Sequence, residues 1–244
     1  MVALVTGASR GIGEETARRF AAAGARVVLA ARTGNDLSRV ANDIVAAGGE
    51  ALGVETDVTN AASVDQLFER TLQTYGRLDV AFNNAGGGHI PRPLADLSED
   101  DFEAAVSGNL RSTFLCMRRE LAMMLHSGGS IVNMSSTAGI GTAPGMAGYN
   151  AAKAGVIALT RTAALEYGPS GIRVNAVAPG PIRTHRVQAL PEDVRAGIAA
   201  QIPLRRLGEP SDVADAVLWL ASSEAGFVNG TTLPIEGGKL IGSA

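Results

Sequence analysis

VALVTGASRGIG, residues 2–13, joins a short apolar run directly to a glycine-rich turn, and this junction is the strongest indication of the fold class. The run 2–6 is predicted as a strand, and a helix-length amphipathic segment begins within the turn of Gly7, Gly11 and Gly13. Glycine allows a tight turn and lets a ligand approach the backbone. The start of the helix offers free N–H groups and a positive dipole end to a pyrophosphate. Because the spacing is G-x-x-x-G-x-G rather than the familiar G-x-G-x-x-G, the prediction depends on the strand–turn–helix context.

The alternation of strand and helix continues along the chain. Apolar runs predict strands at 2–6, 26–30, 51–56, 78–83, 130–135, 172–178 and 231–235, and amphipathic segments predict helices near 12–23, 35–47, 61–75, 98–126, 148–167 and 210–222. Nearly apolar strands that alternate with helices indicate a parallel sheet buried on both faces. We therefore expect a three-layer α/β fold with helices on both faces. Residues 1–244 contain no linker and are expected to form one nucleotide-binding and catalytic domain, with a proline-containing lid at about 181–209. Within the lid, the polar stretch near 191–201 is predicted as a short helix.

Composition narrows the classes of function. The chain has 244 residues, is 46% hydrophobic and has a net charge of −3, which allows one sizeable core and argues against a nucleic-acid partner. No apolar run approaches the length of a membrane span. Cys116 is the only cysteine and lies in an apolar stretch, so we expect a buried thiol, no disulfide within the chain and a cytoplasmic location. The three histidines are too scattered to indicate a metal site.

Glycines and polar side chains follow most of the predicted strands. These segments are 7–13, 31–32, 57–58, 83–86, 135–136 and 179–180. Ligands of open parallel sheets bind beyond the carboxyl ends of the strands. Because parallel strands end at the same edge, we expect these segments to surround one crevice.

Six motifs in order make the sequence recognisable: TGASRGIG (6–13), NNAG (83–86), Asn109, Ser136, YNAAK (149–153) and PG (179–180). Together they resemble the short-chain dehydrogenase/reductase family over essentially the whole chain, and in particular its 3-oxoacyl reductases and its sugar and alcohol dehydrogenases. The resemblance implies a Rossmann-type fold with seven parallel strands, a nicotinamide cofactor, and oxidation of alcohols or reduction of carbonyls. Enoyl reductases of the superfamily space their tyrosine and lysine further apart, so reduction of a carbon–carbon double bond is not expected.

Tyr149 and Lys153 are the residues expected to perform the chemistry. At positions i and i+4 of one helix, their Cβ atoms lie about 5–6 Å apart. A nearby ammonium favours the phenolate form of tyrosine, so we expect a lowered pKa at Tyr149 that suits a general acid/base. The resemblance implies that Lys153 also holds the ribose hydroxyls of the cofactor.

Ser136 and Asn109 complete the predicted catalytic set. Ser136 lies thirteen residues before Tyr149, the separation usual in the family for the serine that donates to the substrate oxygen. Successive strand residues point to opposite faces, so only one of Ser135 and Ser136 should reach the site. Asn109 is interpreted either as an irregularity in a long helix or, from the resemblance, as an anchor in a proton relay to Lys153.

The cofactor-binding residues are expected along the same edge of the sheet. They are Gly7, Ser9, Arg10, Gly11, Ile12, Gly13, Arg32, Asp57, Val58, Asn83, Ala85, Gly86, Tyr149, Lys153, Pro179, Gly180, Ile182 and Thr184. By the resemblance, Asp57 and Val58 match the adenine pocket, and Ile182 and Thr184 match positions at the nicotinamide carboxamide. Asn83 has a second interpretation, in which it ties neighbouring strands together.

The expected cofactor is NADP(H), with NAD(H) as the less favoured alternative. NAD enzymes of this fold usually have an acidic residue at the end of the second strand, where it binds the ribose hydroxyls. Here Ala31 takes that place, and Arg32 follows with a planar fork suited to a 2′-phosphate. Arg10 would approach from the other side, and the Ser9 and Thr33 hydroxyls would add hydrogen bonds.

The expected function is interconversion of a small-molecule carbonyl and a secondary alcohol by NADP(H). Two alternatives remain: a sugar or alcohol dehydrogenase that works oxidatively, and a non-catalytic protein that senses the cofactor. The lid residues Arg183, His185, Arg186, Arg205 and Arg206 are interpreted as a site for an acidic substrate or as solvated surface side chains. The helix 148–167 is rich in small residues, and the family's pairing of this helix across two-fold axes implies a homotetramer.

Overall fold

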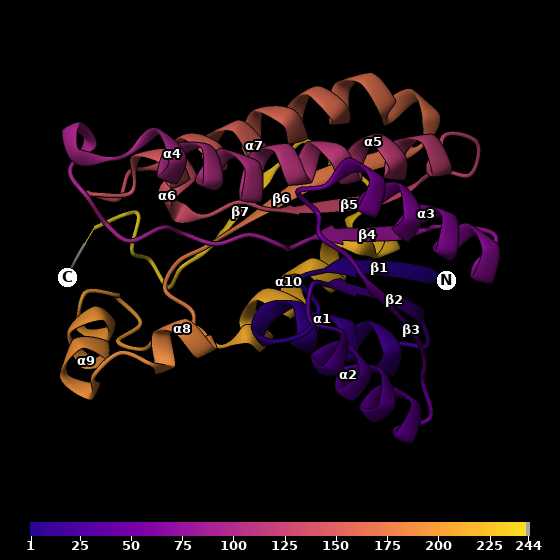
Figure 1. The fold of residues 1–244 in the computed structure, drawn as a ribbon, viewed down its shortest axis with the longest axis horizontal. Helices are drawn as coiled ribbons and strands as arrows, with labels where there is room; N and C mark the ends of the chain where they lie inside the picture. Colours follow the sequence, from indigo (N-terminus) through magenta and orange to yellow (C-terminus); the bar gives the residue numbers. More distant parts are fainter. Residues whose placement is uncertain (243–244) are drawn as a thin grey trace.

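Seven strands form the parallel sheet that the apolar runs predict (Figure 1). The structure is a computed structural model that describes residues 1–242. The strands are β1 (Val2–Thr6), β2 (Arg26–Ala31), β3 (Glu50–Glu55), β4 (Val80–Asn83), β5 (Gly129–Met134), β6 (Ile172–Pro179) and β7 (Thr232–Ile235), in the order β3-β2-β1-β4-β5-β6-β7. All neighbouring pairs are parallel. The predicted fold class and strands are confirmed, with strand ends displaced by two residues or fewer.

Helices cover both faces of the sheet (Figure 1). On one face lie α1 (Gly11–Ala22), α2 (Gly34–Ala46) and α10 (Pro210–Ala221); on the other lie α3 (Ala61–Tyr75), α4 (Glu99–Val106), α5 (Ser112–Met124) and α7 (Ala147–Tyr167). Side chains of β1 alternate between the two cores, because Ala3 and Val5 pack toward α1 while Val2 and Leu4 pack toward α3 and α5. Among residues 1–242, no helix is both long enough and apolar enough to cross a membrane.

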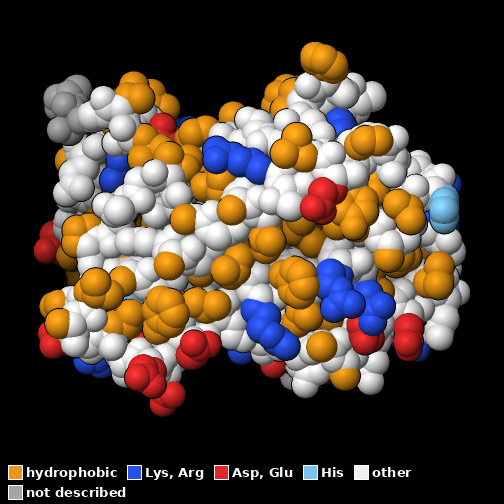
Figure 2. All heavy atoms as spheres, turned by 90° about the horizontal axis from the view of Figure 1, so that it is seen from above, with side chains coloured by type: hydrophobic (Ala, Val, Ile, Leu, Met, Phe, Trp, Pro, Cys, Tyr) orange, Lys and Arg blue, Asp and Glu red, His pale blue; other side chains and the backbone are white. Residues whose placement is uncertain are grey.

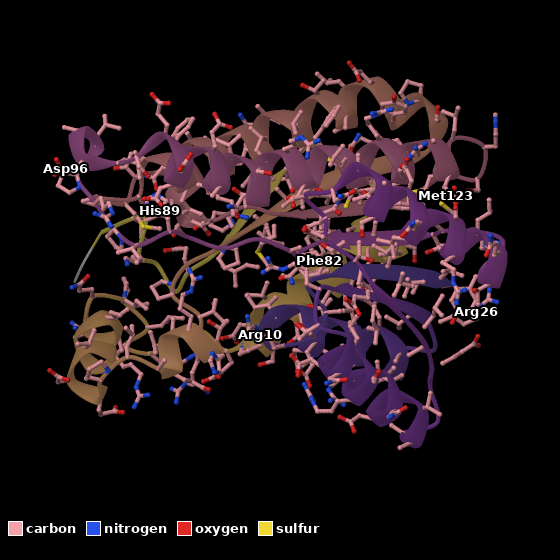
Figure 3. The ribbon with its side chains drawn as sticks, viewed as in Figure 1. Arg10, Arg26, Phe82, His89, Asp96 and Met123 are labelled. Atoms are coloured by element: carbon pink, nitrogen blue, oxygen red, sulfur yellow. The ribbon has the colours of Figure 1, made fainter. Side chains whose placement is uncertain are left out.

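The strand direction gives the molecule two different ends. Figure 3 shows Phe82 in the middle of the sheet, Arg26 and Met123 near the end where strands begin, and Arg10 and His89 on the side where strands finish. The short helices α6 (Thr137–Ile140), α8 (His185–Gln188) and α9 (Glu192–Ala200) also lie on that side (Figure 1). The segments that the sequence predicts for the site are therefore gathered at one edge of the sheet, as expected.

The lid is closed at its base by a short parallel bridge between Ile182 and Gly208. The Arg183 amide donates to the Gly208 carbonyl at 2.7 Å, and the Gly208 amide donates to the Pro181 carbonyl at 3.0 Å. The predicted polar helix of the lid is confirmed as α9, whereas α8 was not expected. The bridge fixes where the lid leaves and rejoins the sheet.

The long helix expected at 98–126 is interrupted by a wider π-type turn over Ser107–Arg111, which separates α4 from α5. The cause lies in Asn109, whose buried side-chain amide donates to the Ala105 carbonyl at 2.8 Å and to the Gly87 carbonyl at 2.9 Å. A side chain that bonds the helix backbone competes with the regular ladder, and π turns of this kind are frequent at functional sites. The interpretation of Asn109 as a helix irregularity is confirmed.

A buried polar network ties the ends of β4 and β5 to two helices. The Asn83 side-chain amide donates to Glu120 Oε2 on α5 and to Asn133 Oδ1 on β5, both at 2.9 Å. The Asn133 amide in turn donates to the Thr160 hydroxyl on α7 at 2.9 Å. Two buried atoms of the network, Glu120 Oε1 and Asn83 Oδ1, have no partner. A protonated carboxyl needs fewer acceptor contacts than a carboxylate, so the unpartnered Oε1 agrees with a neutral Glu120.

Burial raises the pKa of Glu120 from 4.5 to about 8, against a smaller lowering by the Asn83 hydrogen bond. The hydrogen-bonding partner of Glu120 is the uncharged Asn83. The titratable neighbour is the Cys116 thiol, whose own pKa is raised by burial and by the Glu120 charge. Glu120 is therefore mostly neutral at pH 7, and its proton uptake on folding stabilises the native state at low pH.

Replacing Glu120 by Gln should keep the hydrogen bond from the Asn83 amide and remove the titration. Since the folded pKa is raised, this contribution to the free energy of unfolding is complete below pH 4.5 and is lost as the pH rises to about 8. Its slope is at most about 1.4 kcal/mol per pH unit. Urea unfolding of parent and Glu120→Gln between pH 5 and 9 measures it: the parent should lose stability relative to the variant. Parallel curves would show that Glu120 is ionised in the folded state.

Candidate active site

A cleft of about 910 Å³ lies at the carboxyl edge of the sheet, within the usual range of ligand sites. Of the residues predicted for the site, it is lined by Gly7, Ser9, Arg10, Gly11, Ile12, Arg32, Asp57, Val58, Ala85, Gly86, Ser136, Tyr149, Lys153, Pro179, Gly180, Ile182 and Thr184. Three others, Gly13, Asn83 and Asn109, lie behind its wall. The structure thus brings the predicted residues together around one elongated space.

The glycine-rich turn has the backbone form that a phosphate loop needs. Gly7 and Gly11 have φ values of 66° and 60°, which favour glycine. A Cβ on Gly13 would lie 2.3 Å from the Gly7 carbonyl oxygen, so the turn closes on α1 only because this position has no side chain. At the start of α1, Arg10 provides no side-chain cap. The first N–H groups of α1 therefore point into the cleft without a side-chain acceptor, as binding of an anion requires.

Consecutive asparagines at the end of β4 have opposite roles. Asn83 points into the core network, so the structure favours its strand-tying interpretation over a side-chain contact with a ligand. Asn84 was not among the residues predicted for the site. It lines the cleft, and its side-chain amide donates to the carbonyls of Thr6 and Gly7 at 2.9 and 3.2 Å. The two-residue period of a strand is the signal that separates them, because only one of two neighbours can face the crevice.

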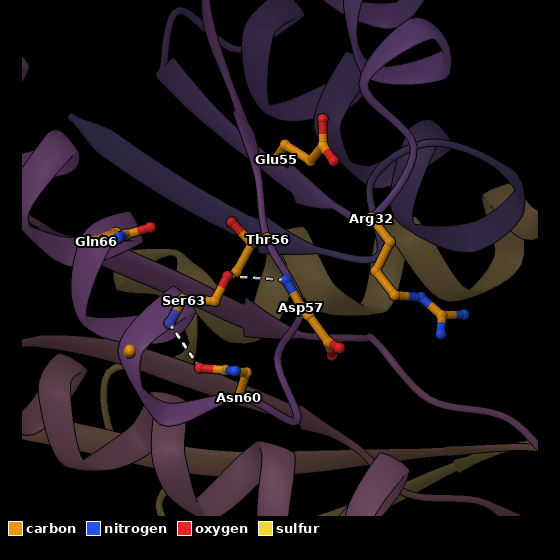
Figure 4. A pocket seen from close by; sticks show the side chains of 8 residues that line it. Arg32, Glu55, Thr56, Asp57, Asn60, Ser63 and Gln66 are labelled. Carbon is orange, nitrogen blue, oxygen red and sulfur yellow. Dashed lines mark hydrogen bonds between the residues drawn. The ribbon is translucent and has the colours of Figure 1, made fainter.

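Arg32 and Asp57 mark the far end of the cleft, where a second hollow of about 530 Å³ adjoins it. Figure 4 shows their side chains extending to the same side, while Glu55 turns the other way. Thr59 donates its hydroxyl and its amide to Asp57 Oδ1, at 2.7 and 2.9 Å. These bonds lower the pKa of Asp57, and the Arg32 charge lowers it further. Asp57 is thus held as a carboxylate with a fixed direction.

A third arginine, unforeseen from the sequence, approaches the glycine-rich turn from α2. Arg39 donates to the Ser9 carbonyl at 3.2 Å and to both carboxylate oxygens of Glu14 at 2.9 Å. Arg39 is the largest of the influences that lower the pKa of Glu14. Arg39 lies in the second helix, about thirty residues after the glycine-rich turn, and no sequence motif predicts its contact with that turn. Arg10 and Arg32, by contrast, are exposed and have no carboxylate partner among residues 1–242.

Lys153 is almost completely buried, with 2% of its surface exposed. Its Nζ donates to the Met134 carbonyl, at the end of β5, at 2.8 Å and lies 5.6 Å from the centre of the Tyr149 ring. Burial lowers the pKa of Lys153 to about 7. The amine is therefore close to half-protonated at neutral pH, and its charge depends on what enters the cleft.

The expected lowering of the Tyr149 pKa is wrong for the protein as it stands. Burial raises the pKa of the phenol, and a hydrogen bond with Ser136 and the charge of Arg186 lower it only in part. The i,i+4 spacing correctly predicted that Tyr149 and Lys153 are neighbours, but spacing says nothing about desolvation. Lys153 itself is desolvated, so its help to the phenolate is weaker than a full positive charge would give.

The two serines at the end of β5 point in different directions. Ser135 is buried and donates its hydroxyl to the Lys153 carbonyl at 3.0 Å. Ser136 begins α6, where its hydroxyl accepts the Ala138 amide at 3.1 Å, and it is also the hydrogen-bonding partner of Tyr149. A Cβ on Gly139 would lie 2.7 Å from the Lys153 carbonyl carbon, so glycine lets α6 pack closely on α7. Nothing in the sequence singled out Gly139.

Asn109 lies behind the cleft and braces the loop after β4. Its Oδ1 accepts the Gly87 amide at 3.1 Å, and a Cβ on Gly86 would lie 2.5 Å from the same atom. The Asn109 carbonyl accepts the Thr113 hydroxyl at 2.7 Å. These contacts describe a residue that positions Gly86 and Gly87, while its place in a proton relay to Lys153 stays a prediction.

Comparison with known proteins agrees with this geometry. A family profile described as enoyl-(acyl carrier protein) reductase matches residues 7–239. Cis-4-hydroxycyclohexanecarboxylate dehydrogenase of Sinomonas cyclohexanicum is 45% identical over 240 residues, covering 97% of this chain and 95% of that protein. A 3-oxoacyl-[acyl-carrier-protein] reductase of Synechocystis sp. is 42% identical, covering 98% and 97%. The crystal structure of a short-chain type dehydrogenase/reductase from Mycobacterium marinum superimposes with a TM-score of 0.93 at 35% identity, covering 98% and 94%.

Proposed function

The chain belongs to the short-chain dehydrogenase/reductase family of oxidoreductases, and we propose that it interconverts a carbonyl and a secondary alcohol with NADP(H), Tyr149 acting as general acid/base. The supporting observation is that Tyr149, Ser136 and Lys153 line the same cleft as the glycine-rich turn. The relatives named above are described as acting on an alcohol or on a 3-oxoacyl group, which agrees with this reaction class.

The cleft fits an extended dinucleotide. Its length runs from Asp57 and Arg32, suited to adenine and a 2′-phosphate, past the free N–H groups of α1, suited to a pyrophosphate. At the other end Ile182 and Thr184 stand beside the catalytic side chains. A Cβ on Gly11 would already lie 3.6 Å from the Thr184 methyl group, so the passage between the two ends is narrow. When bound there, the nicotinamide donates a hydride to a carbonyl carbon or accepts one from a carbinol carbon.

The chain's own residues supply the proton and fix the oxygen. Ser136 and Tyr149 both line the cleft, and Ser136 is close enough to influence the pKa of the phenol. In reduction, Tyr149 gives its proton to that oxygen as negative charge develops, while Ser136 donates a second hydrogen bond. Lys153 lies beside the ring and favours the resulting phenolate. In oxidation the same proton moves in reverse.

The raised pKa of Tyr149 favours the reductive direction at neutral pH. A protonated phenol is ready to act as an acid, whereas oxidation needs the phenolate and therefore a higher pH. An oxidative alcohol or sugar dehydrogenase is thus the second candidate. A cofactor-sensing protein without activity is a third, and the intact Ser136, Tyr149 and Lys153 set argues against it. Reduction of a carbon–carbon double bond, the activity in the profile's description, is disfavoured by the i,i+4 spacing of Tyr149 and Lys153.

Replacing Tyr149 by Phe keeps the ring and removes the transferable proton. Turnover of a panel of ketones, followed by NADPH absorbance, should fall at least ~10²-fold, the low end for general acid catalysis, while NADPH affinity changes little. Tyr167→Phe is the matched control, because it removes the same group from the other end of α7. Turnover within tenfold of the parent in Tyr149→Phe would remove this residue from the mechanism.

The preference for NADP(H) is proposed from the end of β2. Ala31 stands where an acidic residue would repel a 2′-phosphate, and the exposed Arg32 follows it. The nearest carboxylate across the β2–β3 pair, on Glu55, packs instead against the start of α2, 2.8 Å from the Cβ position of Gly34. A hydrogen bond to a charged group contributes roughly 1.5–3 kcal/mol. One such contact corresponds to about a tenfold to hundredfold preference.

The double change Ala31→Asp with Arg32→Ala should reverse this preference, because it adds a carboxylate that repels the phosphate and removes the guanidinium that binds it. The measurement is kcat/KM for NADPH and for NADH in the parent, the double variant and Arg70→Ala, which removes an exposed arginine from α3. The control should behave as the parent. Equal use of both cofactors by the parent would show that Arg32 is a surface residue only.

A homotetramer is proposed from the outer face of α7. Ala151, Ala154 and Ala158 form an exposed stripe of small residues there, and Leu165 is 82% exposed. Figure 2 looks onto this side and shows hydrophobic side chains spread across it between scattered charges. Small residues let two helices approach closely across a two-fold axis.

Light scattering at micromolar concentration should therefore give about four times the 24.9 kDa chain mass. Ala154→Glu places a charge in the stripe and should lower the mass. Val45→Glu, which changes an exposed hydrophobic side chain on α2, should not. A monomer mass for the parent would contradict the proposal.

A further inference from the structure

Most cationic side chains of the lid already have an acidic partner. Arg183 pairs with Glu209 at 2.9 Å, Arg206 with Asp212 at 2.6 Å, and Arg195 with Glu192. Arg186 differs, because it has no carboxylate partner among residues 1–242 and lines the catalytic cleft. Among the arginines that the sequence grouped together, Arg183 and Arg206 are therefore paired with carboxylates, whereas Arg186 lies at the site.

Arg186 is held against bare backbone. Its Nη1 donates to the Gly88 carbonyl at 3.2 Å. Side chains at positions 87 and 88 would contact the guanidinium, because Cβ atoms on Gly87 and Gly88 would each lie 3.4 Å from one of its nitrogens. The guanidinium has five N–H donors, and in the described protein its Nε and Nη2 make no hydrogen bond. One edge of the fork is thus left for a ligand.

Arg186 lies near the Tyr149 phenol. Its charge lowers the pKa of the Tyr149 phenol, so the two side chains are within electrostatic reach across the cleft. Asp57 is the only acidic residue among those that line the cleft, and it lies at the adenosine end beside Arg32. The catalytic end therefore presents a positive charge that nothing in the described protein neutralises.

We propose that Arg186 binds a carboxylate on the substrate, so that the enzyme acts on oxo acids and hydroxy acids. The substrate class rests on the proposed oxidoreductase function; the anion site itself rests on the Arg186 geometry. The free edge of the guanidinium fork fits the two oxygens of a carboxylate, which lie in one plane. A substrate whose oxygen meets Tyr149 and Ser136 would place its acidic group toward α8, where the guanidinium fixes its orientation.

A binding experiment tests the anion site without turnover. Thermal unfolding at saturating NADP⁺ is followed with pentanoate and with pentanamide, which differ in charge but hardly in shape. Pentanoate should raise the Tm of the parent more than pentanamide does. Arg186→Gln should abolish this difference in Tm. Arg183→Gln, which removes a paired arginine outside the cleft, should retain it. Equal shifts by acid and amide in the parent would overturn the proposal, as would a stronger response to methyl phosphate than to pentanoate.

A kinetic experiment tests the substrate class. The reduction of 3-oxobutanoate, 4-oxopentanoate and 4-oxocyclohexanecarboxylate is compared with that of the corresponding amides. The best acid should exceed its amide at least tenfold in kcat/KM, and Arg186→Gln should bring that ratio to about one. If Arg186→Gln instead raises KM for NADPH and leaves the ratio unchanged, Arg186 serves the cofactor and the proposal is wrong.

The two experiments separate this proposal from the proposed function. Carboxylate-specific binding together with no reduction of any ketone would leave the anion site standing and contradict the oxidoreductase activity. Reduction of neutral ketones with no carboxylate effect in either experiment would do the opposite.

Discussion

Lys153 holds its amine in the interior at the junction of α7 and β5, where it donates to the Met134 carbonyl at 2.8 Å. A buried amine without a paired charge is costly, and its pKa falls to about 7 for that reason. This buried position places the amine beside the Tyr149 ring and at the wall of the cleft. Ser135 strengthens the junction from the other side by bonding the Lys153 carbonyl. The Tyr149 phenol is therefore positioned by the same contacts that hold the end of β5 against α7.

Behind that junction the core is polar where strands end. Asn83, Asn133 and Thr160 form a chain of hydrogen bonds from β4 through β5 to α7, with Glu120 on α5 as its far end. Asn109 likewise fixes the loop after β4, because its side chain accepts the Gly87 amide and donates to the Gly87 carbonyl. Each of these amides bonds buried groups of the chain and does not line the cleft. A wall of this kind keeps Ser136, Tyr149 and Lys153 in place before any ligand arrives.

The parts of this arrangement that follow from strand and helix periodicity were predictable. The seven strands, the helix layers and the collection of glycines at one edge all come from local pattern and from the polarity of a parallel sheet. The lid helix α9 was predicted from its flanking prolines and polar face, whereas α8 is too short to leave a periodic signal. The sequence predicted an irregularity at Asn109 as one of two interpretations. It could not predict the π-type turn at Ser107–Arg111, because that turn depends on the hydrogen bond from Asn109 to the distant Gly87 carbonyl.

The electrostatics of the site could not be predicted in the same way. Spacing placed Tyr149 beside Lys153, but the direction of its pKa depends on burial by elements distant in sequence. Likewise the lid arginines look alike in sequence, and only the structure shows that Arg183 meets Glu209 while Arg186 turns to the cleft. Charge type and spacing predict which residues gather; desolvation and pairing, which set their chemistry, require the three-dimensional arrangement.

Transfer of a labelled hydrogen tests most directly whether this cleft performs hydride transfer. NADPH deuterated at both C4 positions is incubated with the enzyme and the ketones and oxo acids, and the alcohol formed is analysed by NMR and mass spectrometry. Direct transfer to the carbonyl carbon predicts one deuterium on the carbinol carbon of the product. An alcohol without deuterium at that carbon, or no alcohol from any carbonyl compound in the panel, would contradict the assignment of this cleft as the site of carbonyl reduction.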